Sequence, residues 1–384
     1  MRHINRYPHN ITNTSASEFV NSLMTIQTPL VRLHYHGLCL DGTVAAIAFQ
    51  EELDHAVRSY AANQHAIMSL PIVELCTVAY NYRKDIDLED WVKGAAGDLY
   101  QKPERGYVVF VDFCPDRETL ECFNRHGIRV LVIDHHYDRL SNVLLDATDL
   151  PRVTFWVSAD PMGRSDSGCS LVLNFFGAKI TYEGLVEIAR RRDLHLHQGA
   201  RHTPEHNLGA WWKSGSVADW LQGGKFFTKL MDTYHDQSAL APLLEEGEAL
   251  SVVDDEKALE ALASLQKLST TYTTQIHGDI TVGIYNIEPA YATEYCTLAP
   301  EDIVCFYTTA SKTTSEKVSY KLSLRCKRDD LDMNALAADF GGGGHRGAAG
   351  AFITIHPAME VVNHLASGMG AFFYCVTDKP LAYV

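Results

Sequence analysis

Short apolar runs rich in β-forming residues alternate with helical stretches between about residue 30 and residue 200. This alternation predicts an α/β fold, a parallel sheet that is covered by helices. Three of the predicted strands, at residues 30–35, 107–111 and 129–133, run directly into His36, Asp112 and Asp134. Ligands of open parallel sheets bind beyond the carboxyl ends of the strands, so we expect these three residues to meet in one crevice.

The pattern changes to a long helix between residues 239 and 272, where leucines recur at near-helical spacing. We interpret this helix as a packed connector between two domains. Apolar runs at residues 280–287, 303–307, 318–325 and 351–355 then predict the strands of a second, smaller α/β domain. The expected organisation is an N-terminal extension at 1–28, a first domain at 29–238, a helical connector at 239–275 and a second domain at 276–384. We expect the functional site in the cleft between the two domains.

The charge balance limits the partners that the chain can attract. Its 384 residues include 33 Lys and Arg against 48 Asp and Glu, a formal net charge of -15. Such a field repels polyanions, so long nucleic acid is a poor partner, whereas a short substrate with few phosphates can still bind in a locally cationic cleft.

The cysteines and the N-terminus indicate a cellular compartment. The nine cysteines are an odd number, are widely scattered and never form a C-x-x-C pair, so we expect neither a disulfide framework nor structural zinc. The segment 1–28 lacks the apolar run of a signal peptide, and no later stretch approaches the length of a membrane span. We therefore expect a soluble, cytoplasmic protein with no membrane partner.

Aspartate and histidine gather in four segments where strands or helices are predicted to end. They are His36-x-x-Cys39-x-Asp41-Gly42, Asp112, Asp134-His135-His136 and Asp193. Carboxylates with a few imidazoles suit divalent cations such as Mn²⁺ or Mg²⁺. Taken singly, an aspartate after a strand is more typical of a helix cap or a turn, but several carboxylates around one point repel one another unless cations lie among them.

These motifs resemble the DHH phosphoesterase family, which is named after the triplet present here at residues 134–136. The similarity covers about residues 30–200 and resumes at 290–355. In the second part, the run Gly341-Gly-Gly-Gly-His-Arg-Gly-Ala-Ala-Gly350 is similar to the signature of the DHH-associated C-terminal domain. Both halves recur together in the nanoRNases, phosphoadenosine phosphatases and cyclic-dinucleotide phosphodiesterases of this family.

The resemblance implies a site with two divalent cations, for which Mn²⁺ is expected and Mg²⁺ or Co²⁺ are alternatives. Its implied metal ligands are His36, Asp41, Asp112, His135 and Asp193, with Asp112 bridging the two ions. Asp134 would orient its neighbouring histidine, and His136 would face the scissile phosphate. The family commonly has an aspartate where this chain has Cys39. Two interpretations of this thiol stay open: it binds a metal, or it only packs against its neighbours.

The C-terminal domain is expected to recognise the substrate. Backbone amides of Gly342, Gly343 and Gly344 can approach a phosphate closely, and His345 and Arg346 can add cationic donors. A flexible loop is the alternative. Arg325 resembles the arginine that holds a terminal phosphate, or else is a surface strand residue. The segment 165–169 resembles a further family motif, although a plain helix cap explains it sufficiently.

The function that this resemblance implies is hydrolysis of linear dinucleotides or very short oligoribonucleotides to mononucleotides. The dinucleotide pGpG, released when cyclic di-GMP is opened, is the first individual candidate. The alternatives are a 3′-phosphoadenosine 5′-phosphate phosphatase and, from a different class, a catalytically inactive nucleotide sensor. A homodimer is the oligomer that the resemblance implies.

Overall fold

The computed structural model describes residues 15–37, 39–63, 73–80, 87–136, 140, 143, 149–158, 165–178, 184–196, 202–220, 224–264, 267–274, 276–286, 292–310, 318–328, 330–355, 364–369 and 372. The chain divides into two compact units. The first comprises Met1–Asp193 and Trp211–Leu244, and the second comprises Leu194–Ala210 and Glu245–Val384.

A parallel five-stranded sheet forms the centre of the first unit. Its order is β2-β1-β3-β4-β5, and every neighbouring pair is parallel. The three strands predicted from the sequence are its three central strands. The bounds are β1 Leu30–His36, β2 Glu74–Tyr80, β3 Gly106–Val111, β4 Arg129–Asp134 and β5 Val153–Val157.

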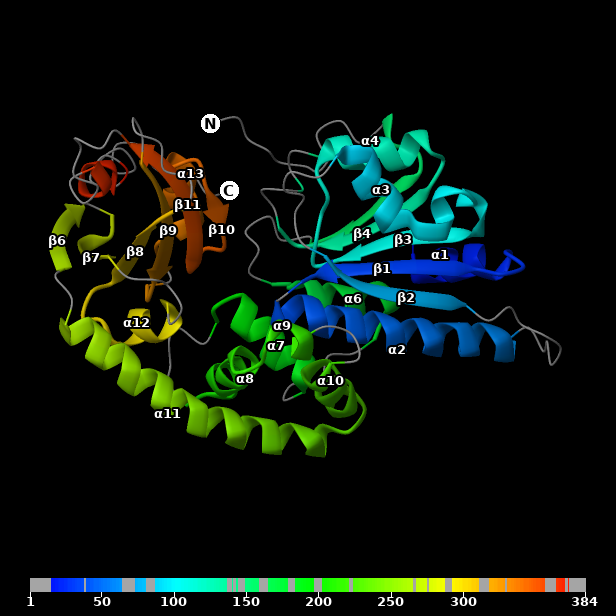
Figure 1. Cartoon of the computed structure of the whole chain (residues 1–384). Coiled ribbons are helices and arrows are strands. Elements are labelled where there is room, and N and C mark those ends of the chain that lie inside the picture. The colour runs from blue at the N-terminus through cyan, green and yellow to red at the C-terminus, as the bar shows by residue number, and fades with distance from the viewer. Residues whose placement is uncertain are drawn as a thin grey trace. The chain divides into compact units, whose positions relative to one another are not determined.

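Helices cover both faces of this sheet (Figure 1). α3 (Leu88–Ala96) and α4 (Arg117–Arg125) lie on one face, whereas α2 (Leu40–Asn63) and α6 (Gly168–Phe176) lie on the other. Phe110 and Val132 pack with Trp91 and Phe123 in the core under α3 and α4. Because both faces are buried, β3 and β4 are apolar through their centres, and β1 is apolar apart from Arg32 and its histidines.

The other helices before the second unit's strands include α1, whose Phe19 and Leu23 are buried although it belongs to the predicted N-terminal extension. Residues 1–14 of that extension lie outside the described part. The bounds are α1 Ala16–Met24, α7 Leu185–Asp193, α8 Pro204–Lys213, α9 Val217–Trp220, α10 Lys225–His235 and α11 Leu240–Ser264, with short 3-10 helices η1 Gly97–Tyr100, η2 Pro103–Arg105 and η4 Gln237–Ala239.

The second unit contains a mixed six-stranded sheet of order β10-β11-β9-β8-β7-β6. β7 and β8 are parallel, and the other neighbouring pairs are antiparallel. One face packs on a core that includes Met333 and Leu336, and the other on a cluster around Phe306. The bounds are β6 Lys267–Thr274, β7 Gly278–Asn286, α12 Ala292–Leu298, β8 Ile303–Thr309, β9 Val318–Cys326, α13 Met333–Asp339, β10 Gly343–Gly344 and β11 Ala348–Ile355.

The predicted helix at 239–272 is wrong at its C-terminal end. α11 ends at Ser264, and residues 267–274 form β6, which pairs antiparallel with β7. Thr270, Thr271 and Thr273 are β-branched and favour a strand, and pairing with β7 satisfies the backbone groups that face that strand. The leucine at position 268 therefore belongs to a sheet and not to the helical stripe.

Within the described ranges, no helix combines the length and the apolar character needed to cross a membrane.

Candidate active site

The carboxyl ends of β1, β3 and β4 bring three of the predicted site residues to one edge of the sheet. His36 ends β1, Asp112 follows β3 directly, and Asp134 ends β4. The register pairs Tyr35 with Val111 and Val111 with Ile133, so the three strands end level with one another. The convergence that the sequence predicted therefore follows from the parallel register.

Asp112 lies at the centre of this edge. Its side chain is buried, and its backbone has the left-handed φ of 54°, which is rare for a residue with a side chain. Oδ1 lies 3.2 Å from Nε2 of His135, and Oδ2 lies 3.7 Å from Nδ1 of His36. Within the described part of the chain, neither oxygen accepts a hydrogen bond of acceptable distance and angle. Two buried carboxylate oxygens of this kind fit a cation that both can bind.

His36, Cys39 and Asp112 form a first group of potential metal ligands. One side-chain ligand atom from each lies within 4.8 Å of the others. Cys39 immediately precedes α2, and its carbonyl accepts the backbone amide of Thr43 at 3.1 Å. Burial, together with the charges of Asp112, Asp193 and Asp41, raises the pKa of the Cys39 thiol well above its usual value. The Cys39 thiol is therefore protonated at neutral pH.

Asp41, His135 and Asp193 form a second group of potential ligands with the same mutual spacing. Asp41 lies in the first turn of α2, and Asp193 ends α7. Nε2 of His135 lies 3.4 Å from Oδ2 of Asp193. Since His135 also lies beside Asp112, the two groups are contiguous.

The charges within these groups are strongly coupled to one another. Burial and the nearby carboxylates of Asp112 and Asp193 raise the pKa of Asp41 to about 8. Burial opposes a charge on His135, but the surrounding carboxylates outweigh it and raise the pKa of this imidazole to about 10. Burial likewise opposes ionisation of Asp112, yet the imidazoles of His135 and His36 hold its pKa well below its usual range. Protons therefore supply the positive charge that divalent cations would supply when bound.

Asp134 holds the turn that carries the two histidines. Its Oδ1 accepts the backbone amide of His135 at 2.9 Å and the Nδ1 hydrogen of His136 at 2.7 Å. The side chain that Asp134 orients is therefore that of His136, while its contact with His135 is to the backbone. With Nδ1 engaged, the opposite nitrogen of His136 is the one that can act on a substrate.

The N-terminal end of α6 holds Asp41 in place. The hydroxyl of Ser167 donates to Oδ1 of Asp41 at 2.7 Å, and the amide of Cys169 lies 3.3 Å from Oδ2. Gly168 lies between these donors and against Asp112. The sequence motif at 165–169 therefore does more than cap a helix, and its similarity to a family motif was the signal for this role.

The predicted substrate-binding residues of the second unit lie on β9, on or next to β10, and in the turn that joins β10 to β11. β11 pairs with both β10 and β9, and this register sets Arg325 opposite Ala348. The guanidinium of Arg325 donates to the Ser323 hydroxyl at 3.0 Å and to the Leu324 carbonyl at 2.8 Å. His345 and Arg346 lie in the turn between β10 and β11.

The glycine-rich run is closely packed. An added Cβ at Gly342 would stand 2.0 Å from the Gly350 carbonyl oxygen. The amide of Gly341 donates to the Ala338 carbonyl, and that of Gly342 donates to the Ala337 carbonyl. The amide of Gly344 donates to the Asn334 side chain, and that of His345 donates to the Ala348 carbonyl. These donors are engaged within the protein. The glycines thus serve close packing, and the side chains of Arg325, His345 and Arg346 are the better candidates for binding a phosphate.

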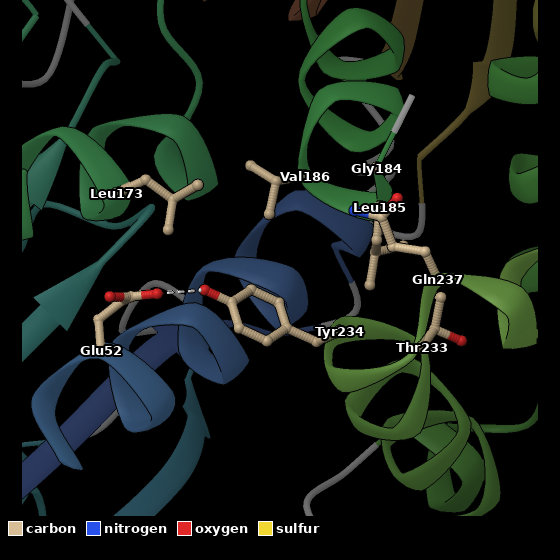
Figure 2. A pocket seen from close by; sticks show the side chains of 8 residues that line it. All are labelled: Glu52, Leu173, Gly184, Leu185, Val186, Thr233, Tyr234 and Gln237. Atoms are coloured by element: carbon tan, nitrogen blue, oxygen red, sulfur yellow. Dashed lines mark hydrogen bonds between the residues drawn. The ribbon is translucent and has the colours of Figure 1, made fainter. Parts of the chain in front are cut away.

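A cavity of about 210 Å³ lies elsewhere in the first unit, between α2, α6, α7 and α10 (Figure 2). Tyr234 crosses it and donates its hydroxyl to Glu52 at 2.8 Å, the contact drawn as a dashed line in Figure 2. None of the predicted site residues lines this cavity. The candidate site is therefore the cluster at the sheet edge and not the cavity.

A scan against protein-family models finds no match, and a search of the curated proteins finds none either. Among solved structures, the chain is similar to the DHH domain of a protein described as a member of a family of ribosomal proteins. The identity is 14%, the TM-score is 0.54, and the match covers 92% of this chain and 89% of that one. The chain has the DHH fold. The predicted α/β class, with a parallel sheet and a smaller second α/β domain, is confirmed.

Two further similarities to solved structures are looser. RecJ of Thermus thermophilus in complex with Mn²⁺ has 12% identity and a TM-score of 0.49, over 94% of this chain and 54% of that one. A pGpG-specific phosphodiesterase from Vibrio cholerae has 12% identity and a TM-score of 0.44, over 91% of this chain and 99% of that one. The fold assignment rests on the first comparison alone.

Proposed function

We propose that this DHH-fold chain is a metal-dependent phosphodiesterase that hydrolyses linear dinucleotides or very short oligoribonucleotides to mononucleotides. The first candidate substrate is pGpG. The observation that carries the proposal is the pair of contiguous ligand groups at one sheet edge, His36 with Cys39 and Asp112, and Asp41 with His135 and Asp193.

The donors in these groups fit divalent cations. Three carboxylates with two imidazoles suit Mn²⁺ first, with Mg²⁺ or Co²⁺ as alternatives. Asp112 approaches residues of both groups, and both its oxygens are buried without a hydrogen-bond donor among the described residues. It is therefore the residue suited to bridging two ions. When bound, divalent cations would activate water and stabilise the attacking and leaving oxygens of the phosphate.

His136 would act on the phosphate during hydrolysis. Burial lowers the pKa of its imidazole, but the neighbouring Asp134 carboxylate outweighs burial and raises it. The protonated ring holds Nδ1 on Asp134 and can donate from Nε2 to a phosphate oxygen as negative charge builds there. Asp134 would therefore act as a positioning residue for His136.

A short substrate fits the charges of the chain. The net charge of -15 disfavours a long polyanion. Arg325, His345 and Arg346 could still hold one terminal phosphate of a short nucleotide, since Arg325 lies on β9 opposite the start of β11 and the other two lie in the turn that leads into β11. We propose that these side chains give the second unit its role in substrate binding.

The test is a turnover assay of the purified full-length protein with Mn²⁺. The substrates are pGpG, pApA, a pentanucleotide RNA, 3′-phosphoadenosine 5′-phosphate and polyphosphate, and the products are separated by chromatography. The variant that removes the proposed chemistry is the double substitution Asp134→Ala with His135→Ala. Glu52→Gln is the matched control, because Glu52 belongs to the same unit but lines the separate cavity.

Release of mononucleotides from the dinucleotides by the wild type and the control, but not by the double variant, would support the proposal. Faster release of phosphate from 3′-phosphoadenosine 5′-phosphate would favour the phosphatase alternative. Dinucleotide binding without any turnover in Mn²⁺, Mg²⁺ or Co²⁺ would overturn the enzymatic proposal and favour a nucleotide sensor.

A further inference from the structure

A second cluster of metal-ligating side chains lies on the face of the first sheet that α3 and α4 cover. It consists of Glu89, Cys122 and His126 together with Tyr100, and we call it the α3–α4 cluster. Sγ of Cys122 donates to Oε2 of Glu89 at 3.1 Å, and the Tyr100 hydroxyl donates to Oε1 at 2.6 Å. Nε2 of His126 contacts the same Oε1.

Two packed helices fix the positions of these side chains. Cys122 lies in α4, and His126 follows four residues later as its C-cap, so both project from the same side. Glu89 lies in the first turn of α3. The rings of Trp91 on α3 and Phe123 on α4 meet edge to face at 6.3 Å, which keeps the two helices together.

We propose that Glu89, Cys122 and His126 bind a zinc ion. One ligand atom from each residue lies within 4.8 Å of the other two. A thiolate, an imidazole and a carboxylate are the three donor types that Zn²⁺ takes in proteins. Tetrahedral zinc separates its ligand atoms by about 3.3–3.7 Å, so the carboxylate of Glu89 needs only a small outward shift. The Tyr100 hydroxyl or a water would complete the coordination.

The site is accessible to a metal from solvent. The side chain of Glu89 is 48% exposed and that of His126 is 31% exposed, while Cys122 is buried behind them. Burial and the Glu89 carboxylate raise the pKa of the Cys122 thiol to about 11, so the thiol is protonated in the metal-free protein. Zinc binding forms an S–Zn bond and releases this proton to solvent.

The α3–α4 cluster is separate from the candidate active site. His126 lies three residues before β4 begins at Arg129, whereas Asp134 lies at the opposite end of this strand. A strand of this length separates its ends by about 17 Å. The proposed zinc site therefore does not depend on the proposed hydrolase function. The proposed zinc site departs from the expectation of no structural zinc. That expectation rested on the lack of a C-x-x-C motif, whereas the ligands proposed here come from separate segments of the chain.

Cobalt is the probe for the test, because Co²⁺ replaces Zn²⁺ and a cobalt–thiolate bond absorbs in the near ultraviolet. The full-length protein is stripped with a chelator and titrated with Co²⁺ alone. The starting chain carries Cys39→Ser, since Cys39 is the thiol beside the other cation groups. We expect a sulfur-to-cobalt absorption band in this chain and its loss when Cys122→Ser is added.

Two further variants separate metal binding from folding. His126→Gln is expected to weaken Co²⁺ binding at least tenfold. Removing even a residue that only hydrogen-bonds to a metal ligand typically costs about tenfold or more in affinity, and loss of a ligand should cost no less. Cys76→Ser is the matched control, since this half-buried thiol accepts from Arg32 and lies outside the cluster, and it should leave the band unchanged. Circular dichroism melting shows which variants are folded. The proposed site would be overturned if the Cys39→Ser chain showed no band at excess Co²⁺. It would also be overturned if the band stayed equal after Cys122→Ser, or if His126→Gln left the Co²⁺ affinity unchanged.

Discussion

Gly168 lies so close to Asp112 that an added Cβ at position 168 would stand 2.4 Å from the Cβ of Asp112. Gly42 approaches the same region, where an added Cβ would stand 2.6 Å from the His36 carbonyl oxygen. The first turns of α6 and α2 can therefore approach the sheet edge only because these positions lack side chains. This proximity allows Asp41 and Asp112 to lie in contiguous ligand groups.

The substitution Gly168→Ala should move Asp112 out of place. A shift of about 1 Å in a reacting group costs roughly a hundredfold in rate, so we expect kcat/KM to fall by about that factor. Manganese affinity should fall as well. Initial rates and isothermal titration with Mn²⁺ measure the two effects. Gly94→Ala is the control, because nothing lies within 4 Å of the added Cβ, and equal activity in both variants would contradict the role of Gly168.

Asp134→Asn should reduce turnover while leaving bound manganese unchanged. The amide oxygen can still accept from Nδ1 of His136, but the negative charge that favours the protonated ring is lost. Loss of such a charged partner typically lowers activity about 10- to 100-fold. Steady-state kinetics give kcat, and elemental analysis gives the metal content. A variant that lost its metal in parallel with its activity would show that Asp134 acts on the ions instead.

Manganese should stabilise the first unit against heat. Without cations, protons on Asp41 and His135 offset the charge of the neighbouring carboxylates, and bound cations would displace these protons. At a Mn²⁺ concentration of a hundred times the Kd, binding contributes about 2.7 kcal/mol to the free energy of unfolding, or roughly 5–10 °C in Tm for a unit of this size. Differential scanning calorimetry of chelator-treated protein measures the shift. The Asp112→Asn variant should lose it, and an equal shift there would place the stabilising ion elsewhere.

His34 should make the first unit sensitive to mild acid. Its ring is buried, contacts the Ala95 carbonyl at 2.9 Å and stacks on Phe110, and burial lowers its pKa to about 3. Its unfolded pKa is about 6.5, so between these values the unfolded chain binds more protons. The unfolding free energy should therefore fall as the pH drops below about 6.5, by up to about 1.4 kcal/mol per pH unit from this group.

Urea unfolding at several pH values, followed by tryptophan fluorescence, tests this expectation. His34→Gln keeps a donor for the Ala95 carbonyl and should flatten the pH dependence between about pH 6.5 and 5. His235→Gln, whose parent side chain is 56% exposed, is the control and should keep the wild-type slope. Parallel slopes in all three chains would exclude His34 as the source.

The central strands could be predicted from the sequence, whereas the edge strands could not. β3 and β4 are buried on both faces and give continuous apolar runs, and β1 is apolar apart from Arg32 and its histidines. The missed strands β2, β5, β6 and β10 all lie at sheet edges. Edge strands can have fewer buried positions, and the polar sequence of β6 shows how weak the hydrophobic pattern then becomes.

The candidate site shows a similar division. The sequence could single out the candidate ligand residues because each follows a strand or lies in a recognisable motif. The contact between Ser167 and Asp41 could not be predicted from spacing, since 126 residues separate the two and only the fold brings them together. The hydrogen bond from the Gly344 amide to the Asn334 side chain likewise could not be predicted from a glycine-rich motif.

The candidate metal ligands span the chain from His36 to Asp193, the last residue of the first stretch of the first unit. A ribosome must therefore synthesise almost the whole of this stretch before the second ligand group can be complete. Fragments that end between His136 and Asp193 would carry His36, Asp41, Asp112 and His135 but would lack one carboxylate. Uptake of the full metal complement would thus mark the completion of this part of the chain, and truncated products would be deficient in metal.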